Sequence, residues 1–258
     1  MNGNEFKSIF ETYFPTESAY EWDNVGLQVG TLNKDITGIV ISLDLTLEVI
    51  DEALAKNANM IVLHHPLIFK PLKTIHTETY LGQLLQKLIQ HGITLYVAHT
   101  NFDVAPMGMN LYLSSMLQLH DPEPLDSINE IESLGVIGTL DKAYSLDELV
   151  AYVKQVFQLD SLRLIGGDKE TYQRIAITGG SGSSVINTAI SKGVDAYISG
   201  DITYHHALDA KNLGFTILDV GHNIEKHALD GLASFLKEKG IGCPIHISKV
   251  NTNPYQVK

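Results

Sequence analysis

Hydrophobic residues along the chain alternate between short continuous runs and stripes with helical spacing. The runs at 37–43, 60–63 and 93–98 have the length of buried strands. Between them, segments 46–57 and 78–90 carry apolar residues three and four positions apart, which is typical of amphipathic helices. Strands that alternate with helices of this length predict βαβ units and a largely parallel sheet.

The second half of the chain repeats this alternation after a segment rich in Pro and Asp, residues 120–127, which we interpret as a loop. Ser145 and Glu148 have the spacing of a capping box, which predicts that a helix begins here. The further strands that we expect are 133–140, 174–178, 195–199 and 215–220, and the helices are 145–157, 184–192, 204–213 and 224–239. These elements predict a first α/β lobe at 1–124 plus 226–258 and a second at 125–225.

The two halves match each other when one is shifted along the other. Residues 40–62 shifted by 136 positions fall on 176–198 with five identities in 23, and residues 92–103 shifted by 122 fall on 214–225 with three in 12. We infer an internal duplication that gives two similar, intertwined α/β lobes. The alternative is that any two βαβ units share such apolar spacing.

The shifts align polar residues that follow predicted strands: His65 with Asp201, Thr100 with His222, and Asp103 with Glu225. Ligands bind at the carboxyl edge of parallel α/β sheets. We therefore expect a site between the lobes, in which the two polar clusters face one another.

Metal ligation is the chemistry that these residue types favour. His64 and His65 follow a strand, and adjacent residues on extended backbone point opposite ways. One ion would bind both only if the chain bends, whereas two neighbouring ions could take one each. Histidine is the commonest metal ligand. The alternative is a pair of core or capping histidines.

Two further clusters extend this hypothesis. Asp103 offers a hard oxygen ligand and His99 a ligand or a supporting group, although Asp103 could instead cap a helix that begins near Met107. His222 and Glu225 are three residues apart, which places them on one face of a helical turn. They could share a metal ion or form a surface pair.

Apart from His99, the clusters together supply three imidazoles and two carboxylates, more than one tetrahedral zinc ion needs. Such a set suits two divalent ions with open positions for water and substrate. Without thiolates it fits Zn, Mn, Fe or Co equally. His205 and His206 are candidates, with His99, for a general base or a substrate contact; the alternative is that they face solvent or core. The segment 179–183 is glycine-rich and could hold a phosphate group.

Composition limits the function classes. The 258 residues include 18 Lys and Arg against 30 Asp and Glu, a net charge of −12, which argues against a phosphate-binding track for nucleic acid and against anionic membranes. Cys243 is the single cysteine, which fits a reducing compartment. The chain shows no signal-peptide pattern and no apolar run long enough to span a bilayer, so we expect a cytoplasmic protein.

These motifs resemble those of the GTP cyclohydrolase 1 type 2 homologues, also called the Nif-three-like family. The matching segments are 22–27 (WDNVGL), 63–66 (LHHP), 99–103 (HTNFD), 200–206 (GDITYHH) and 221–225 (GHNIE). The resemblance implies a two-lobed α/β fold with a dinuclear metal site between the lobes, in which Glu225 bridges the ions. It also implies a toroidal homohexamer, a trimer of dimers. The ligands that it implies are His64, His65, Asp103, His222 and Glu225.

Two functions from different classes follow. The first is a metal-dependent hydrolase of a small molecule; if the substrate is the nucleotide GTP, as the resemblance implies, the guanine imidazole ring would open and release formate. The second is a non-catalytic metal-binding scaffold or regulatory interaction protein. A nucleic-acid-binding ring is disfavoured by the charge.

Overall fold

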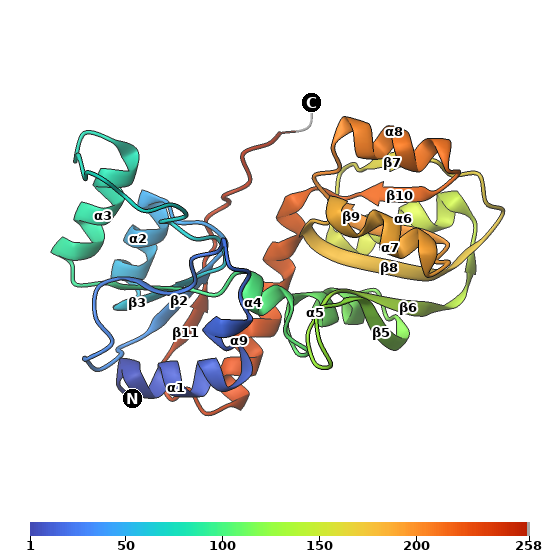
Figure 1. Ribbon diagram of the computed structural model, residues 1–258. Coiled ribbons are helices and arrows are strands. Elements are labelled where there is room, and N and C mark those ends of the chain that lie inside the picture. Colours follow the sequence, from blue (N-terminus) through green and yellow to red (C-terminus); the bar gives the residue numbers. More distant parts are fainter. Residues whose placement is uncertain (257–258) are drawn as a thin grey trace. The chain divides into compact units, whose positions relative to one another are not determined.

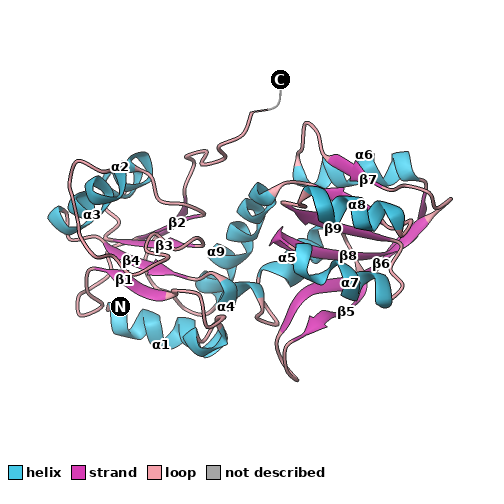
Figure 2. Cartoon of the chain, turned by 45° about the horizontal axis from the view of Figure 1, so that its top comes forward, coloured by secondary structure: helices cyan, strands magenta, loops and turns pink. Residues whose placement is uncertain are grey.

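The computed structural model describes residues 1–256 of the chain (Figure 1). The chain divides into two compact units. Unit 1 comprises Met1–Phe102 and Leu229–Pro254, and unit 2 contains Asp103–Ala228. Each unit is built on its own sheet, so the fold is mixed α/β with two sheets, as expected (Figure 2). Every helix within residues 1–256 is too short or too polar to cross a membrane.

Unit 1 contains a five-stranded sheet in the order β1-β4-β3-β2-β11. The three central strands and β11 are parallel, and β1 is an antiparallel edge strand. The strands are β1 (Gly26–Val29), β2 (Ile39–Ser42), β3 (Met60–Leu63), β4 (Thr94–Val97) and β11 (Ile245–Ile247). The helices are α1 (Gly3–Tyr13), the short η1 (Thr16–Ser18), α2 (Leu47–Ala55), α3 (Tyr80–Gln90), α4 (Thr100–Asp103) and α9 (Ala228–Glu238), of which α4 and α9 extend by one residue into unit 2.

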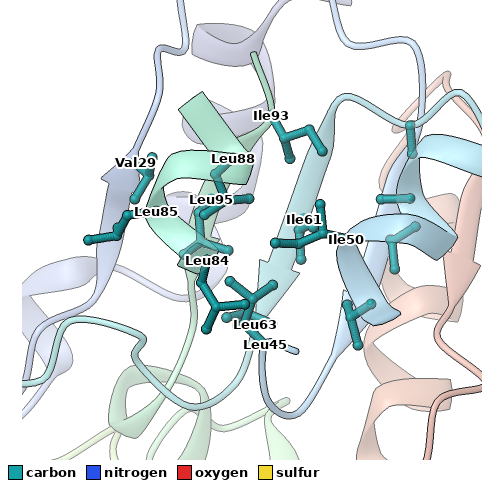
Figure 3. Close-up of a cluster of buried hydrophobic side chains, with 14 of the residues drawn as sticks. Val29, Leu45, Ile50, Ile61, Leu63, Leu84, Leu85, Leu88, Ile93 and Leu95 are labelled. Atoms are coloured by element: carbon teal, nitrogen blue, oxygen red, sulfur yellow. The ribbon is translucent and has the colours of Figure 1, made fainter. Parts of the chain in front are cut away.

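The core of unit 1 explains why these segments form a sheet covered by helices on both faces. Side chains in strands alternate between faces, and along β4 Leu95 and Val97 pack in the cluster that α2 and α3 cover (Figure 3). Tyr96 points to the other face and packs its ring against Phe6 and Phe10 of α1. Burial on both faces accounts for the continuous apolar runs that characterise central parallel strands.

Unit 2 contains a six-stranded sheet in the order β5-β6-β8-β9-β10-β7. Strands β8, β9 and β10 are parallel, and β5, β6 and β7 pair antiparallel. The strands are β5 (His120–Ser127), β6 (Ser133–Tyr144), β7 (Arg163–Ile165), β8 (Tyr172–Ser181), β9 (Ala196–Gly200) and β10 (Thr216–Asp219). The helices are α5 (Met109–Met116), α6 (Leu146–Phe157), η2 (Ser183–Val185), α7 (Ile186–Ser191), α8 (Tyr204–Asn212) and η3 (His222–His227).

The parallel parts of the two sheets share one register. In unit 1, Ile39 of β2 pairs with Met60 of β3, and Ile175 of β8 pairs with Ala196 of β9 in unit 2, a shift of 136 on both strands. Met60 also pairs with Thr94, and Ala196 with Thr216, which reproduces the shifts of 136 and 122. The two units thus have the same order of strands and helices, and their strands pair in the same register. A duplicated βαβαβ unit would give this pattern.

Two sequence-based boundaries differ from the structure. The segment 120–127, expected to be a loop, is strand β5, which pairs with β6 at the edge of the sheet of unit 2. Proline is tolerated there because an edge strand has backbone positions that need no ladder hydrogen bond. The main segment of unit 2 runs from Asp103 to Ala228 and so includes β5, whereas the sequence-based boundaries were 125 and 225.

The capping box at the start of α6 gives a first prediction. Ser145 Oγ accepts from the backbone N–H of Glu148, whose carboxylate accepts from the backbone N–H of Ser145. Ser145→Ala should lower the free energy of unfolding by about 1 kcal/mol, measured by urea denaturation. Ser115→Ala is the control, because the Ser115 hydroxyl only bonds back to the Tyr112 carbonyl within α5. Equal effects of the two substitutions would show that the box contributes no stability.

Candidate metal centre

Three histidines gather at the carboxyl edge of the sheet of unit 1. Strand β3 ends at Leu63, and the chain bends through His64 and His65, so that both rings turn to the same side. The His64 ring centroid lies 4.9 Å from that of His65 and 5.1 Å from that of His99, which follows β4. One ring nitrogen of each lies within 4.8 Å of the others, a spacing that fits one metal ion. Because of this bend, the two adjacent histidines do not point in opposite directions as they would on extended backbone.

Each of these imidazoles is oriented through Nδ1. The Nδ1 atom of His64 lies 2.9 Å from the Ala98 carbonyl oxygen, and that of His65 lies 2.8 Å from Asp44 Oδ1. Both partners are acceptors, so each Nδ1 donates its proton, and in the neutral ring Nε2 is then the nitrogen that can bind a metal ion. A carboxylate or carbonyl behind Nδ1 is the usual support of a metal-binding histidine.

Asp23 gives the same support to His99. Its side chain is fully buried, and its oxygens accept from His99 Nδ1 at 2.9 Å and from the Thr100 hydroxyl at 2.6 Å. Burial of Asp23 favours the neutral acid, but the hydrogen bonds from His99 and Thr100 outweigh it and lower the pKa of Asp23 to about 2. Asp23 therefore carries a negative charge at neutral pH and accepts the His99 Nδ1 hydrogen bond as a carboxylate. The sequence matched segment 22–27 to the family motifs but indicated no such role for Asp23.

In unit 2, His222 and Glu225 lie on the 3-10 helix η3, as their spacing predicts. Residues three apart are stacked on such a helix, and His222 Nε2 is 3.3 Å from Glu225 Oε2. The His222 Nδ1 atom donates to Asp201 Oδ2 at 2.8 Å, so this imidazole too is oriented by a carboxylate. Glu225 is buried, with an exposed fraction of 3%. An imidazole nitrogen and a buried carboxylate on one side of a helix are both donors that a divalent metal ion can bind.

The glycine-rich segment at the end of β8 makes room for this pair. A Cβ at Gly180 would collide with the Glu225 carboxylate and lie 3.4 Å from His222 Nε2. Glycine is therefore required by the close approach of Glu225. The phosphate-binding role considered for 179–183 is not supported: residues 179–181 belong to β8, and the Gly182 N–H donates to Ser199 Oγ at 3.0 Å.

Asp219 connects the two loops that carry Asp201 and His222. Its buried carboxylate accepts from the backbone N–H of Ile202 at 3.2 Å and from that of Gly221 at 3.1 Å, and it pairs with Arg163. The two N–H groups belong to the residues adjacent to Asp201 and His222. No sequence motif had pointed to Asp219.

The remaining candidates lie as follows. Asp103 ends α4, and its carbonyl oxygen accepts from Asn110 Nδ2 at 2.9 Å. It does not cap the next helix, because Gly108 is the N-cap of α5. His205 and His206 lie exposed on the first turn of α8, and the His206 ring bonds to the Thr203 hydroxyl. Among residues 1–256, neither belongs to a group of donors that could hold a metal ion.

The donor chemistry fits a divalent metal. Unit 1 gathers three imidazoles without a thiolate, and unit 2 places an imidazole beside a carboxylate. Nitrogen and carboxylate oxygen are the ligands that Zn, Mn, Fe and Co share, so the set does not select one of them.

Comparison with known proteins agrees with the motifs. The chain matches the family model Duf34/NIF3 (NGG1p interacting factor 3) over residues 1–254. It is 38% identical to a Lactococcus lactis protein and 36% identical to a Streptococcus pneumoniae protein, each with 99% of both chains covered and each named GTP cyclohydrolase 1 type 2 homolog. A crystal structure of a Bacillus cereus protein related to NIF3 superimposes with a TM-score of 0.95 at 30% identity, covering 100% of this chain and 99% of that one. The chain therefore belongs to the Duf34/NIF3 family.

Proposed function

We propose that this protein binds two divalent metal ions and is a metal-dependent hydrolase. The proposed ligands are His64, His65, Asp103, His222 and Glu225. The observation that carries the proposal is the orientation of the imidazoles: the Nδ1 atoms of His64, His65 and His222 all face an acceptor oxygen. Histidines held only by packing have no need of an acceptor oxygen behind each ring, whereas metal-binding histidines commonly have a carboxylate or a backbone carbonyl there.

The residues around the proposed ligands have separate roles in orienting them, in proton transfer and in substrate binding. When bound, divalent ions supply Lewis acidity that lowers the pKa of water and polarises a substrate. Asp44 and Asp201 hold the tautomers of His65 and His222. His99 is the proposed proton carrier, because the Asp23 carboxylate accepts from its Nδ1 and fixes the ring orientation, while Nε2 can exchange a proton. His205 and His206, exposed on α8, are proposed as substrate contacts.

Metal content tests the ligand assignment. Elemental analysis of the purified protein should give about two ions per chain, and both His65→Ala and Glu225→Ala should bring this below one. The two residues lie in different units, so a loss in both variants would show that both units contribute ligands. His91→Ala, an exposed histidine after α3, is the control and should keep the full content. A content that neither variant changes would overturn the assignment, and a loss in only one variant would overturn the shared site.

Turnover tests the hydrolase assignment separately. GTP is the first substrate to try, since the Lactococcus and Streptococcus relatives carry the name GTP cyclohydrolase 1 type 2 homolog. Formate release that Glu225→Ala abolishes would support ring opening, and phosphate release would indicate a phosphatase instead. A fully metal-loaded protein that releases neither product from GTP and other nucleotides would favour the non-catalytic scaffold.

A further inference from the structure

An exposed aromatic cluster borders the histidines of unit 1. Trp22, the only tryptophan of the chain, has 57% of its surface exposed, and Phe69 has 45%. The Trp22 ring centroid lies 5.7 Å from that of Phe69 and 5.7 Å from that of Tyr20. We name these three side chains the aromatic platform. Contiguous exposed aromatic surface is uncommon in proteins and marks binding sites more often than isolated apolar residues do.

Hydrogen bonds to buried groups fix the backbone of the aromatic platform. The Tyr20 N–H donates to the Thr100 hydroxyl at 3.1 Å, and the Asp23 N–H donates to the Tyr20 carbonyl at 2.9 Å. The buried Asp23 carboxylate is in turn held by His99 and Thr100, so residues on both sides of Trp22 are anchored.

The second loop of the platform is anchored to the first. Gln28 Oε1 accepts from the Ile68 N–H at 2.9 Å, and Gln28 Nε2 donates to the Asn24 carbonyl at 2.8 Å. Phe69 follows Ile68 directly. The backbone that carries both exposed rings is therefore already ordered. The entropic cost of ordering the loops when a ligand binds should be small.

The platform lies directly beside the proposed chemistry. The Trp22 ring centroid is 6.1 Å from that of His99, with the planes at 74°, and the His99 centroid is 5.1 Å from that of His64. A planar ring that contacts Trp22 would therefore bind next to the residues that surround His99.

We propose that Trp22 is the stacking residue for the planar heteroaromatic part of a small-molecule substrate, such as a purine. Flat π surfaces prefer aromatic side chains because stacking adds dispersion and quadrupole attraction to the loss of water. An aliphatic substrate would gain nothing from such rings. The placement of the reacting part near His99 rests on the proposed function, but the stacking itself does not.

Trp22 provides its own test because it is the single tryptophan. Its fluorescence, excited at a wavelength that nucleotides do not absorb, should be quenched in a saturable way by GMP, AMP or pterin. Ribose 5-phosphate, which lacks the ring, should leave the emission unchanged. Quenching by none of the three heteroaromatic probes, with metal-loaded or metal-stripped protein, would overturn the proposal.

Variants separate this proposal from the metal-binding function. In equilibrium dialysis with GMP or whichever probe binds most tightly, Trp22→Ala should weaken binding about tenfold or more and Trp22→Phe should restore most of it. Ile89→Ala, an equally exposed apolar residue of unit 1, is the control. Metal content should be unchanged in all three variants, so a failure of the ligand assignment would not be mistaken for a failure here. Equal affinity of Trp22→Ala and the native protein would refute the platform.

Discussion

A Gly180→Ala variant is expected to lose most of its bound metal while it stays folded. The methyl group would enter the space that the Glu225 carboxylate occupies and lie 3.4 Å from His222 Nε2. The backbone at Gly180 also has a φ of +60°, a conformation that costs an L-residue about 1–2 kcal/mol. With about 1–3 kcal/mol for the overpacked contact, the free energy of unfolding should fall by about 2–5 kcal/mol.

Gly193→Ala is the matched control for this variant. Gly193 lies in the same unit with a φ of +68°, and a Cβ there meets nothing within 4 Å. It therefore carries the backbone strain without the collision, and it should lose about 1–2 kcal/mol of stability and no metal. Unfolding in urea and elemental analysis measure the two effects. If the two variants held the same amount of metal, Glu225 would not need the space at Gly180, and its place among the ligands would be in doubt.

Most of the parallel architecture could be predicted because its signal is local. A buried strand such as Met60–Leu63 is a short apolar run that can be recognised without knowing its neighbours in space. The predicted bounds of β3 equal the observed ones. The repeat also carried over to the register, since the pair Ile39–Met60 in unit 1 and the pair Ile175–Ala196 in unit 2 have the same separation along the chain. The spacing of His222 and Glu225 predicted their common side of η3 for the same local reason.

Several of the missed features depend on contacts between distant segments. The edge strand β5 has an exposed pattern and two prolines, and only its pairing with β6 makes it a strand. Strands β7 and β11 have three residues each, too few for a period to be read. Asp23 is 76 residues from His99, and nothing in the sequence pairs them. The supporting carboxylates were therefore found only in the structure. The histidines that they orient had already been predicted from the sequence.

An Asp219→Ala variant is expected to lose about 3 kcal/mol of stability and also metal. Its carboxylate satisfies the N–H groups of Ile202 and Gly221, and an unsatisfied buried N–H costs about 1–3 kcal/mol. The pairing with Arg163 adds little because that side chain is 69% exposed. Freed of these bonds, the loops before α8 and η3 would no longer fix Asp201 against His222. Unfolding measured with a chelator present excludes the stabilisation that bound metal would add.

Asp195→Ala is the comparison that shows whether the metal loss is specific. Asp195 also accepts from two backbone N–H groups, those of Gln173 and Arg174, and pairs with Lys169. It lies in the same unit but contacts neither loop of the His222 pair, so its removal should lower stability and leave metal content unchanged. Asp219→Asn, which keeps one acceptor oxygen, should fall between the native protein and Asp219→Ala in both measurements. If Asp195→Ala and Asp219→Ala lost the same fraction of metal, the loss would reflect general loosening of unit 2. A loss confined to the Asp219 variants would instead show that this buried carboxylate sets the position of His222.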